Sequence, residues 1–492
     1  MAIKPIVFKS IKYTLVAFSI VALMLLAARA YIAQGGPPLE PWHRFVPDEM
    51  SEEALNQSDW AGYLKAEAAI FDQVRTEVTQ QLKAEANVPY NRYFEGSPIY
   101  PGRFAQDWNR SYVFEPEGVP VGVVVLLHGL TDSPYSLRHI TRLYAAHGYV
   151  SVAIRLPAHG TVPGALTKVK WEEWQAATRL AVREARRRTG SAVPLHIVGF
   201  SNGGALALKY ALDALDDHRL AMPDRLILIS PMMGLTGFAR FAGLAGLPAV
   251  LPSFAKAAWL SVLPEFNPFK YNSFPVNGAR QAHRLTVALE ERITRYAREG
   301  RLARLPPVLT FQSLIDFTVS TRSVVSSLHA LLPQNGSELV LFDMNRAAKL
   351  SLLMKPELET KLTRILPPPP RSFRTVIITN ANPGTGEVVE KVTEAGESTE
   401  QTRPLGLSYP ADIFSLSHVA LPFPTDDALY GLKPSTDEDF GISLGTIAAR
   451  GERGALIVSL DGLLRTPSNP FFSYLTDRIK EGISSAPAQQ AR

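Results

Sequence analysis

The chain has 492 residues, of which 46% are apolar, so it is long enough for one large domain with insertions or for two domains. Lysine and arginine exceed aspartate and glutamate by only 51 to 46, and we interpret the one dense basic cluster, residues 183–190, as the solvated end of a helix rather than a nucleic-acid surface. The absence of cysteine excludes disulfides, thiolate metal sites and a cysteine nucleophile.

The N-terminus has the pattern of a signal sequence or membrane anchor. Lysines at positions 4, 9 and 12 precede an apolar run over residues 13–28, which places the N-terminus in the cytoplasm and the rest of the chain outside the membrane, in the periplasm or another extracytoplasmic space. Ala28-Arg29-Ala30 resembles a cleavage site, and cleavage there would give a secreted protein. We favour a retained anchor over residues 1–35, in which Arg29 snorkels to the interface.

A linker and an amphipathic helix are predicted between the anchor and the main domain, over residues 36–110. The linker is rich in proline and glycine at 34–41, and residues 52–86 carry apolar side chains three to four positions apart, which is typical of a helix packed on a core. The residues of this stripe are Trp60, Leu64, Ala68, Phe71, Val74, Val78 and Leu82.

Short apolar runs then alternate with helical stretches, such as 136–147 and 171–188. Continuous apolar runs are typical of strands that are covered on both faces, and strands that alternate with helices form a mostly parallel sheet. We therefore predict an α/β domain over residues 111–482, with a sheet flanked by helices, and a disordered tail at 483–492. The predicted strands are 120–129, 149–156, 194–201, 225–230, 307–313 and 338–343.

Two long segments interrupt this alternation. Residues 231–300 are very apolar and rich in proline before a helical, arginine-rich stretch, and we expect them to form a cap insertion. Residues 344–415 contain a proline run, a predicted strand at 373–379, and a polar, acidic stretch that has the composition of an exposed hairpin or flexible loop. We treat them as a second insertion.

Two segments match the G-x-S-x-G pattern, in which glycines flank a nucleophilic serine, and they centre on Ser201 and Ser443. Such a serine occupies a tight turn between a buried strand and a helix. Ser201 has this context, because the strand-like 194–200 precedes it and a helix-like segment follows. Ser443 follows the polar "PSTDEDF", and no histidine comes after it in the chain. Ser201 is therefore the candidate nucleophile.

A serine nucleophile needs a histidine base and a carboxylate that orients it, here in the chain order serine, acid, histidine. Asp316 lies just beyond a predicted strand and fits the acid, with Asp343 as a rival at the end of the next strand. His418, in a proline-bounded loop after both candidates, fits the base. We interpret the other histidines downstream of Ser201 as surface or packing residues, namely His218, His283 and His329.

An oxyanion hole requires backbone N–H donors beside the nucleophile. We expect them from Asn202, which follows the nucleophile, and from Leu130, in the loop after an early strand. His128 and His159 lie near the expected site, and we interpret both as structural. The sequence contains no metal-binding motif, and we predict no cofactor or metal.

Five motifs together resemble the α/β-hydrolases of the lysophospholipase, monoacylglycerol lipase and carboxylesterase group. They span roughly residues 110–470 in order: "LLHGLTDSPYSLR", "RLPAHGTVPG", "VGFSNGG", "SLIDFTVS" and "SLSHVALPF". The resemblance implies a serine ester hydrolase with Ser201, Asp316 and His418 as triad, and a cap formed by residues 231–300. The N-terminal anchor and the long segment before His418 depart from the family pattern.

The hypothesis from sequence is an exported, membrane-anchored enzyme that hydrolyses lipid-like or other apolar esters through an acyl-enzyme. Its partners would be a small-molecule or lipid ester and the membrane, and not nucleic acid. One alternative keeps the triad but cleaves amides, as serine aminopeptidases do. Another is a catalytically silent binding module of the cell envelope.

Overall fold

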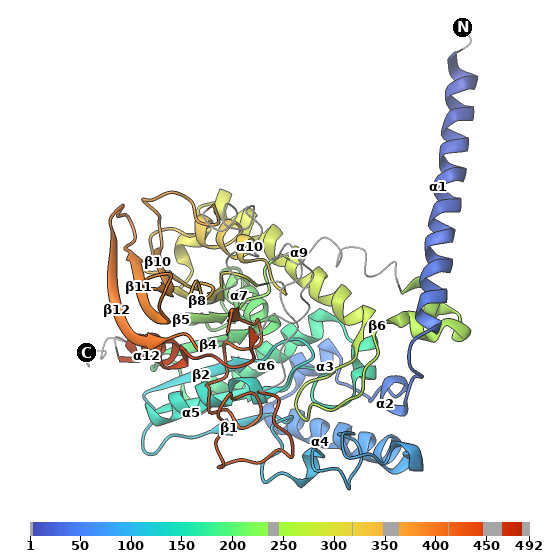
Figure 1. Cartoon of the computed structure of the whole chain (residues 1–492), viewed down its shortest axis with the longest axis horizontal. Coiled ribbons are helices and arrows are strands. Elements are labelled where there is room, and N and C mark those ends of the chain that lie inside the picture. The colour runs from blue at the N-terminus through green and yellow to red at the C-terminus, as the bar shows by residue number, and fades with distance from the viewer. Residues whose placement is uncertain are drawn as a thin grey trace.

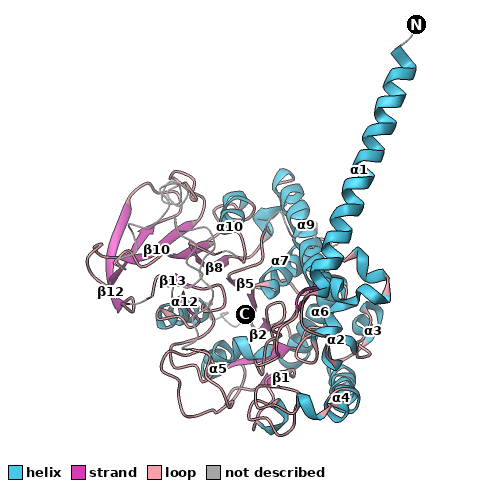
Figure 2. Ribbon diagram, turned by 45° about the vertical axis from the view of Figure 1, so that its right-hand side comes forward, coloured by secondary structure: helices cyan, strands magenta, loops and turns pink. Residues whose placement is uncertain are grey.

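A ten-stranded sheet forms the centre of the protein (Figures 1 and 2). The computed structural model describes residues 3–234, 246–316, 318–347, 364–411, 413–445 and 465–484. The strand order is β1-β3-β2-β4-β5-β8-β9-β10-β11-β12. The strands are β1 (Tyr112–Phe114), β2 (Gly122–Leu127), β3 (Tyr149–Ile154), β4 (Leu195–Phe200), β5 (Arg225–Ile229), β8 (Val308–Ser313), β9 (Glu338–Phe342), β10 (Arg374–Asn380), β11 (Glu387–Thr393) and β12 (Glu400–Ser408).

All six predicted strands are present, and the parallel pairing from β3 to β10 confirms the predicted mostly parallel sheet. Their continuous apolar sequence has a physical reason, since alternate side chains enter two separate buried clusters. Odd-numbered residues of β2, such as Val125, pack with α6 and α7, whereas even-numbered ones, such as Val124, pack with α5 and α12. These helices are α5 (Arg138–Ala146), α6 (Trp171–Thr189), α7 (Asn202–Ala214) and α12 (Phe472–Ser484).

The segment before the candidate histidine extends the sheet. β10 pairs in parallel with β9, and β11 and β12 follow as an antiparallel hairpin at the sheet edge. The predicted strand at 373–379 is therefore confirmed, and the polar stretch forms a regular hairpin. Pro404 and the many exposed residues of β12 suit an edge strand, which leaves one row of backbone groups unpaired. Residues 348–363 lie outside the described part of the chain.

The predicted amphipathic helix is divided into α3 (Glu52–Gln57) and α4 (Trp60–Glu77), with short turns after it. Asp59 causes the break, because its backbone is extended and its side chain accepts a hydrogen bond from the N–H of Gly62 as the N-cap of α4. The buried face is also rotated from the predicted stripe, since Ala68 is exposed and Glu67 is buried.

Glu67 is buried because it belongs to an ion cluster that joins the N-terminal region to the sheet. Arg155, directly after β3, places its guanidinium against Glu49, with N–O distances of 2.8 and 3.0 Å, and 3.3 Å from Glu67. Burial raises the pKa of Glu67, and the charge of Arg155 and hydrogen bonds from Ser111 partly offset this effect. The cluster fixes the N-terminal segment on the α/β domain.

The predicted cap region contains two short strands and a long helix. These are β6 (Trp259–Ser261), β7 (Phe274–Pro275) and α9 (Val276–Arg298), and residues 235–245 are outside the described range. The buried face of α9 packs against α7. Other short elements are α2 (Pro41–Arg44), α10 (Thr321–Ser326), β13 (Ser415–Leu416) and β14 (Arg465–Thr466).

The N-terminal helix α1 (Ile3–Gln34) stands clear of the rest of the molecule except at its C-terminal end (Figure 1). Its segment Val16–Gln34 is the one helix in the described part of the chain that is long and apolar enough to cross a membrane. At its base, Arg29 donates to the carbonyl of Trp259 and Gln34 to that of Ser253, so the helix ends against residues of the predicted cap.

Candidate active site

Ser201 occupies a strained turn between β4 and α7. Its φ of 53° lies in the left-handed region, which is unfavourable for any residue other than glycine. The turn is tight enough to require its glycines: a Cβ on Gly203 would lie 1.9 Å from the carbonyl oxygen of Leu127, and one on Gly199 would lie 2.3 Å from that of Gly203. The Ser201 N–H donates to the carbonyl of Ile229, which holds the turn against β5.

The His418 loop is tied to the ends of the neighbouring strands. Ser313, the last residue of β8, donates its hydroxyl to the carbonyl of Leu416, and the side chain of Asn345 donates to the carbonyl of Ile413. The imidazole stacks on Phe200, with ring centroids 5.5 Å apart. The loop therefore reaches the nucleophile even though β10, β11 and β12 intervene in the sequence.

Asp316 lies in the turn after β8 and is held from several sides. Its Oδ1 accepts the backbone N–H groups of Thr318 and Val319, at 2.8 and 3.0 Å. Burial alone would raise the pKa of Asp316, but the charge and hydrogen bond of His418 and these two N–H groups hold it below its ordinary value. Asp316 is therefore an ionised carboxylate at neutral pH.

The three predicted side chains form one hydrogen-bond chain. Asp316 Oδ2 lies 2.8 Å from His418 Nδ1, and His418 Nε2 lies 2.9 Å from Ser201 Oγ. The ionised carboxylate can only accept, so Nδ1 carries the proton and Nε2 accepts from the serine hydroxyl. Ser201 and His418 are 6% and 8% exposed, so the chain is largely shielded from water. This arrangement can deprotonate the serine hydroxyl.

The two predicted oxyanion donors belong to segments beside the nucleophile. Asn202 is the first residue of α7, where the helix leaves N–H groups without an internal partner. Leu130 follows Gly129, whose Cβ, if present, would lie 3.3 Å from Ser201 Cβ. Neither backbone N–H donates a hydrogen bond to any residue that the structure describes. Both remain available for a developing oxyanion.

The rival residues lie elsewhere. Asp343 directly follows β9, and its Oδ2 accepts hydrogen bonds from Arg346 and from the hydroxyl of Thr379, each at 2.8 Å, and not from a histidine. His329 is buried against Phe373 and bonds Thr310, and burial lowers its pKa to about 3. The remaining candidates are His283 on α9, exposed His218, and exposed Ser443 in an irregular segment.

The two histidines near the site have structural contacts, as predicted. His128 Nδ1 lies 2.9 Å from the carbonyl oxygen of Gly129, and its Nε2 accepts the N–H of Leu156. Burial lowers the pKa of His128 well below its ordinary value, so the ring is neutral and links the ends of β2 and β3. Burial also lowers the pKa of His159, to about 4.

Two supporting residues were not identified from the sequence. The side-chain amide of Gln312 donates to Asp316 Oδ2 at 3.1 Å, and a glutamine four positions before the acid in an apolar strand was the available signal. The backbone N–H of Tyr271, in the predicted cap, donates to the carbonyl of Thr131 at 2.8 Å. Thr131 follows Leu130 and has a φ of 62°, so this bond holds a strained residue in the loop. No sequence pattern indicated it.

Part of the chain is similar to known proteins. Residues 124–350 match the model of the Alpha/beta hydrolase family, a range that contains Ser201 and Asp316 but ends before His418. A stretch of 98 residues is 33% identical to a thermostable monoacylglycerol lipase of Bacillus sp. (strain H-257); it covers 20% of this chain and 38% of that protein. The match therefore spans well under half of the relative's length.

Three solved structures are also similar to part of the chain. A structure of the metagenome-derived lipolytic enzymes LipS and LipT is 19% identical, with a TM-score of 0.38, over 52% of this chain and 97% of that one. A monoglyceride lipase of Saccharomyces cerevisiae is 15% identical, with a TM-score of 0.37, over 47% of this chain and 82% of that one. Est1E of Butyrivibrio proteoclasticus is 18% identical, with a TM-score of 0.34, over 52% of this chain and 92% of that one.

The strand order, the strained serine turn and the family match over residues 124–350 lead to one assignment. The chain has the α/β-hydrolase fold, and its residues 124–350 match the family of that name.

Proposed function

We propose that the protein hydrolyses carboxylic esters through a covalent acyl-enzyme, with Ser201 as nucleophile, His418 as base and Asp316 as the carboxylate that orients the base. The observation that carries this proposal is the hydrogen-bond chain from Asp316 through His418 to the strained Ser201. A hydroxyl is a poor nucleophile until a positioned base takes its proton, and this chain provides that base.

The acylation step begins when Ser201 Oγ attacks the ester carbonyl carbon and His418 Nε2 takes the hydroxyl proton. The carbonyl oxygen becomes an oxyanion that accepts the N–H groups of Leu130 and Asn202. The bond from the carbonyl carbon to the alcohol oxygen then breaks, and the alcohol leaves with the proton from His418. Water attacks the acyl-enzyme in the same way, and the acid and free Ser201 are released.

A lipid-like ester is the substrate class that we propose. The relative that matches part of the chain is a monoacylglycerol lipase, which supports an ester with an acyl chain. The apolar composition of residues 231–300 supports it as well, because a cap over an acyl chain must present apolar surface. The length of Val16–Gln34 supports a lipid substrate too, because an enzyme anchored by this segment would act beside membrane lipids.

We also propose that α1 stays attached as a membrane anchor and that the catalytic domain lies outside the cytoplasm. Arg29 and Gln34 bond the carbonyls of Trp259 and Ser253, and Ala30 is buried in the same contact. Cleavage after Ala30 would remove the Arg29 contact. The lysines before the apolar run support a cytoplasmic N-terminus.

A fluorophosphonate probe tests the mechanism directly, because it reacts only with an activated serine. The full chain in a non-ionic detergent is labelled and mapped by peptide mass, beside Ser201→Ala and His418→Ala. We expect one adduct at Ser201, which is lost in both variants. Labelling that persists in His418→Ala would contradict the assigned base, and a folded chain that does not label would refute the proposed function.

The substrate class is tested on the same preparation. Nitrophenyl esters of short and long acyl chains, monoacylglycerols and aminoacyl amides are compared by kcat/KM. We expect esters to be cleaved in preference to amides and longer chains in preference to acetate. Faster cleavage of aminoacyl amides would instead favour an aminopeptidase.

A further inference from the structure

A cavity of about 660 Å³ lies away from the catalytic centre, at the base of α1. Three segments form it: residues 37–44 of the linker after α1, residues 81–91 after α4, and residues 262–265 of the predicted cap. We call it the linker cavity. Its volume is within the range of small-molecule sites, and none of Ser201, Asp316 and His418 lines it.

Trp42 carries an unused hydrogen-bond donor in the wall of the linker cavity. Its side chain lines the cavity and is 6% exposed, and its Nε1 has no hydrogen-bond partner among the residues that the structure describes. The indole is fixed by stacking on Tyr93, with ring centroids 5.1 Å apart. A buried N–H without an acceptor costs free energy. A ligand oxygen that accepts this hydrogen bond would remove that cost, which favours binding.

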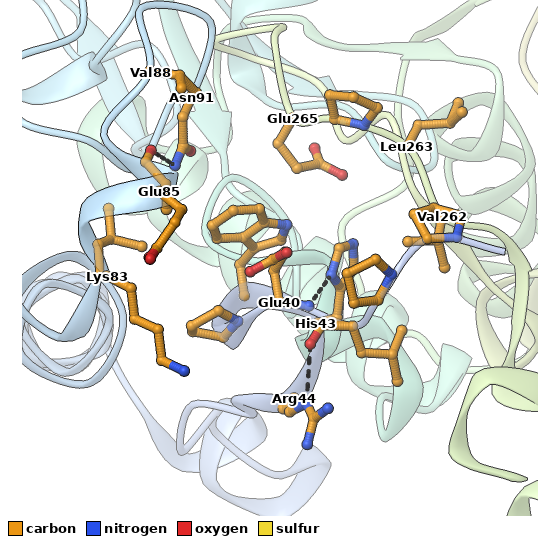
Figure 3. A pocket seen from close by; sticks show the side chains of 18 of the residues that line it. Glu40, His43, Arg44, Lys83, Glu85, Val88, Asn91, Val262, Leu263 and Glu265 are labelled. Carbon is orange, nitrogen blue, oxygen red and sulfur yellow. Dashed lines mark hydrogen bonds between the residues drawn. The ribbon is translucent and has the colours of Figure 1, made fainter.

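Charges of both signs surround the opening. Figure 3 shows Lys83 and Glu85 on one side of the cavity and Glu40 facing them, with the buried Glu265 above. The charged groups of Lys83 and Glu85 form no hydrogen bond or ion pair within the described part of the chain. A ligand with one negative and one positive group would pair with Lys83 and Glu85, whereas a simple anion would be repelled by the carboxylates.

The position of the linker cavity indicates where its ligand comes from. The segment that can span a membrane ends at Gln34, and the cavity wall begins at Pro37. Lys256 donates to the carbonyls of Gln34 and Gly36, which fixes the chain between the two features. With α1 inserted, the cavity lies at the level of the lipid headgroups, where tryptophan is also favoured. The apolar side chains of Leu82, Val88 and Val262 complete its walls.

We propose that the linker cavity binds the head region of a zwitterionic glycerophospholipid from the adjacent leaflet. The N–H of Trp42 donates to a phosphate or ester oxygen, Lys83 pairs with the phosphate, and Glu85 pairs with the ammonium group. This inference rests on the membrane insertion of α1 proposed above, and it does not depend on ester hydrolysis. The lipid bound here is a structural ligand and is not cleaved.

Photo-crosslinking tests this proposal. The full chain is reconstituted in phosphatidylcholine vesicles that contain a small fraction of phosphatidylethanolamine with a diazirine beside the glycerol ester. Adducts are mapped in wild type, Trp42→Phe and Lys83→Ala, with Trp171→Phe and Lys65→Ala as matched controls outside the cavity. We expect adducts within residues 37–44, 81–91 or 262–265, about tenfold fewer in the first two variants, and no change in the controls.

The other outcomes separate the possible failures. Labelling of α1 without labelling of the cavity segments, or labelling that persists in both cavity variants, would overturn the proposal. Equal labelling by a phosphatidylglycerol probe would overturn the assignment of a zwitterionic lipid. An unlabelled α1 would show that the helix is not inserted in the membrane, and this would overturn the proposal as well. Hydrolysis of a soluble nitrophenyl ester, measured in parallel, should be unchanged in Trp42→Phe. A chain that binds the probe but cleaves no ester would refute only the proposed function.

Discussion

The catalytic centre and the linker cavity lie along one segment of the predicted cap, yet their polar groups are satisfied in opposite ways. Residues 262–265 line the cavity, and Tyr271, a few residues later, bonds the loop of Leu130. In the catalytic centre each of the three side chains already has a partner. In the cavity the Trp42 donor and two opposite charges have none that the structure describes. A preorganised reaction site needs internal partners for its reacting side chains and keeps only its oxyanion donors free, whereas a binding site keeps side-chain groups free for its ligand.

Asp316→Asn should disable ester hydrolysis and leave the linker cavity intact. The amide cannot stabilise a positively charged His418 and favours the wrong tautomer, so we expect kcat on a nitrophenyl ester to fall about 10³–10⁴-fold. Lipid labelling of the linker cavity should not change. Ser201→Ala provides the fully inactive reference, and a fall in kcat of less than about tenfold would show that Asp316 does not orient the base.

Arg155→Met tests whether the two regions belong to one folding unit. The substitution leaves the carboxylates of Glu49 and Glu67 without their shared cation, and we expect a loss of about 3–5 kcal/mol in the free energy of unfolding. Urea unfolding of the full chain in detergent, followed by tryptophan fluorescence, measures it. Arg142→Met, at a half-exposed ion pair with Glu438, is the matched control and should cost less than about 1 kcal/mol.

A smaller effect of Arg155→Met, or a separate unfolding transition of the N-terminal segment, would contradict a single unit. Restoration of stability by adding Glu67→Gln would identify the uncompensated buried charge as the cause, because the neutral amide does not require the cation.

The sequence predicted which residues meet at the candidate active site, but it did not predict the linker cavity, and the reason is physical. Ser201 lies in a local pattern whose glycines are required by contacts within the turn itself, such as that of Gly203 with Leu127. The position of Asp316 follows from the end of its strand. A few consecutive residues specify each of those features. The six apolar strands around them are specified by equally short stretches of sequence.

The remaining features depend on contacts between distant segments. The cavity walls come from residues more than 200 positions apart, and Trp42 is unremarkable until its neighbours are placed. The role of Glu67 could not be predicted either, because its burial is favourable only once Arg155 packs against it. The rotated face of α4 follows from the same ion cluster, which no helical periodicity of apolar residues can indicate.

Mild acid should affect both regions through buried neutral histidines. Burial lowers the pKa of His43, beside the linker cavity, and of His159, near the catalytic centre, to about 4. The unfolded chain binds these protons near pH 6.5 and the folded chain only near pH 4, so their stabilising contribution is complete above pH 6.5 and decreases as the pH falls towards 4. We expect each histidine to contribute a loss of about 2 kcal/mol between pH 7 and pH 5.

Single variants assign this pH dependence to one region or the other. His43 Nε2 lies 2.9 Å from the hydroxyl of Ser273, so His43→Gln keeps a polar group there but cannot titrate. We expect the difference in unfolding free energy between pH 7 and pH 5 to shrink by about 2 kcal/mol in this variant, and not in His218→Gln, whose histidine is exposed. An unchanged pH dependence in His43→Gln would mean that His43 is accessible to protons in the folded chain, and that the wall of the linker cavity opens to water in mild acid.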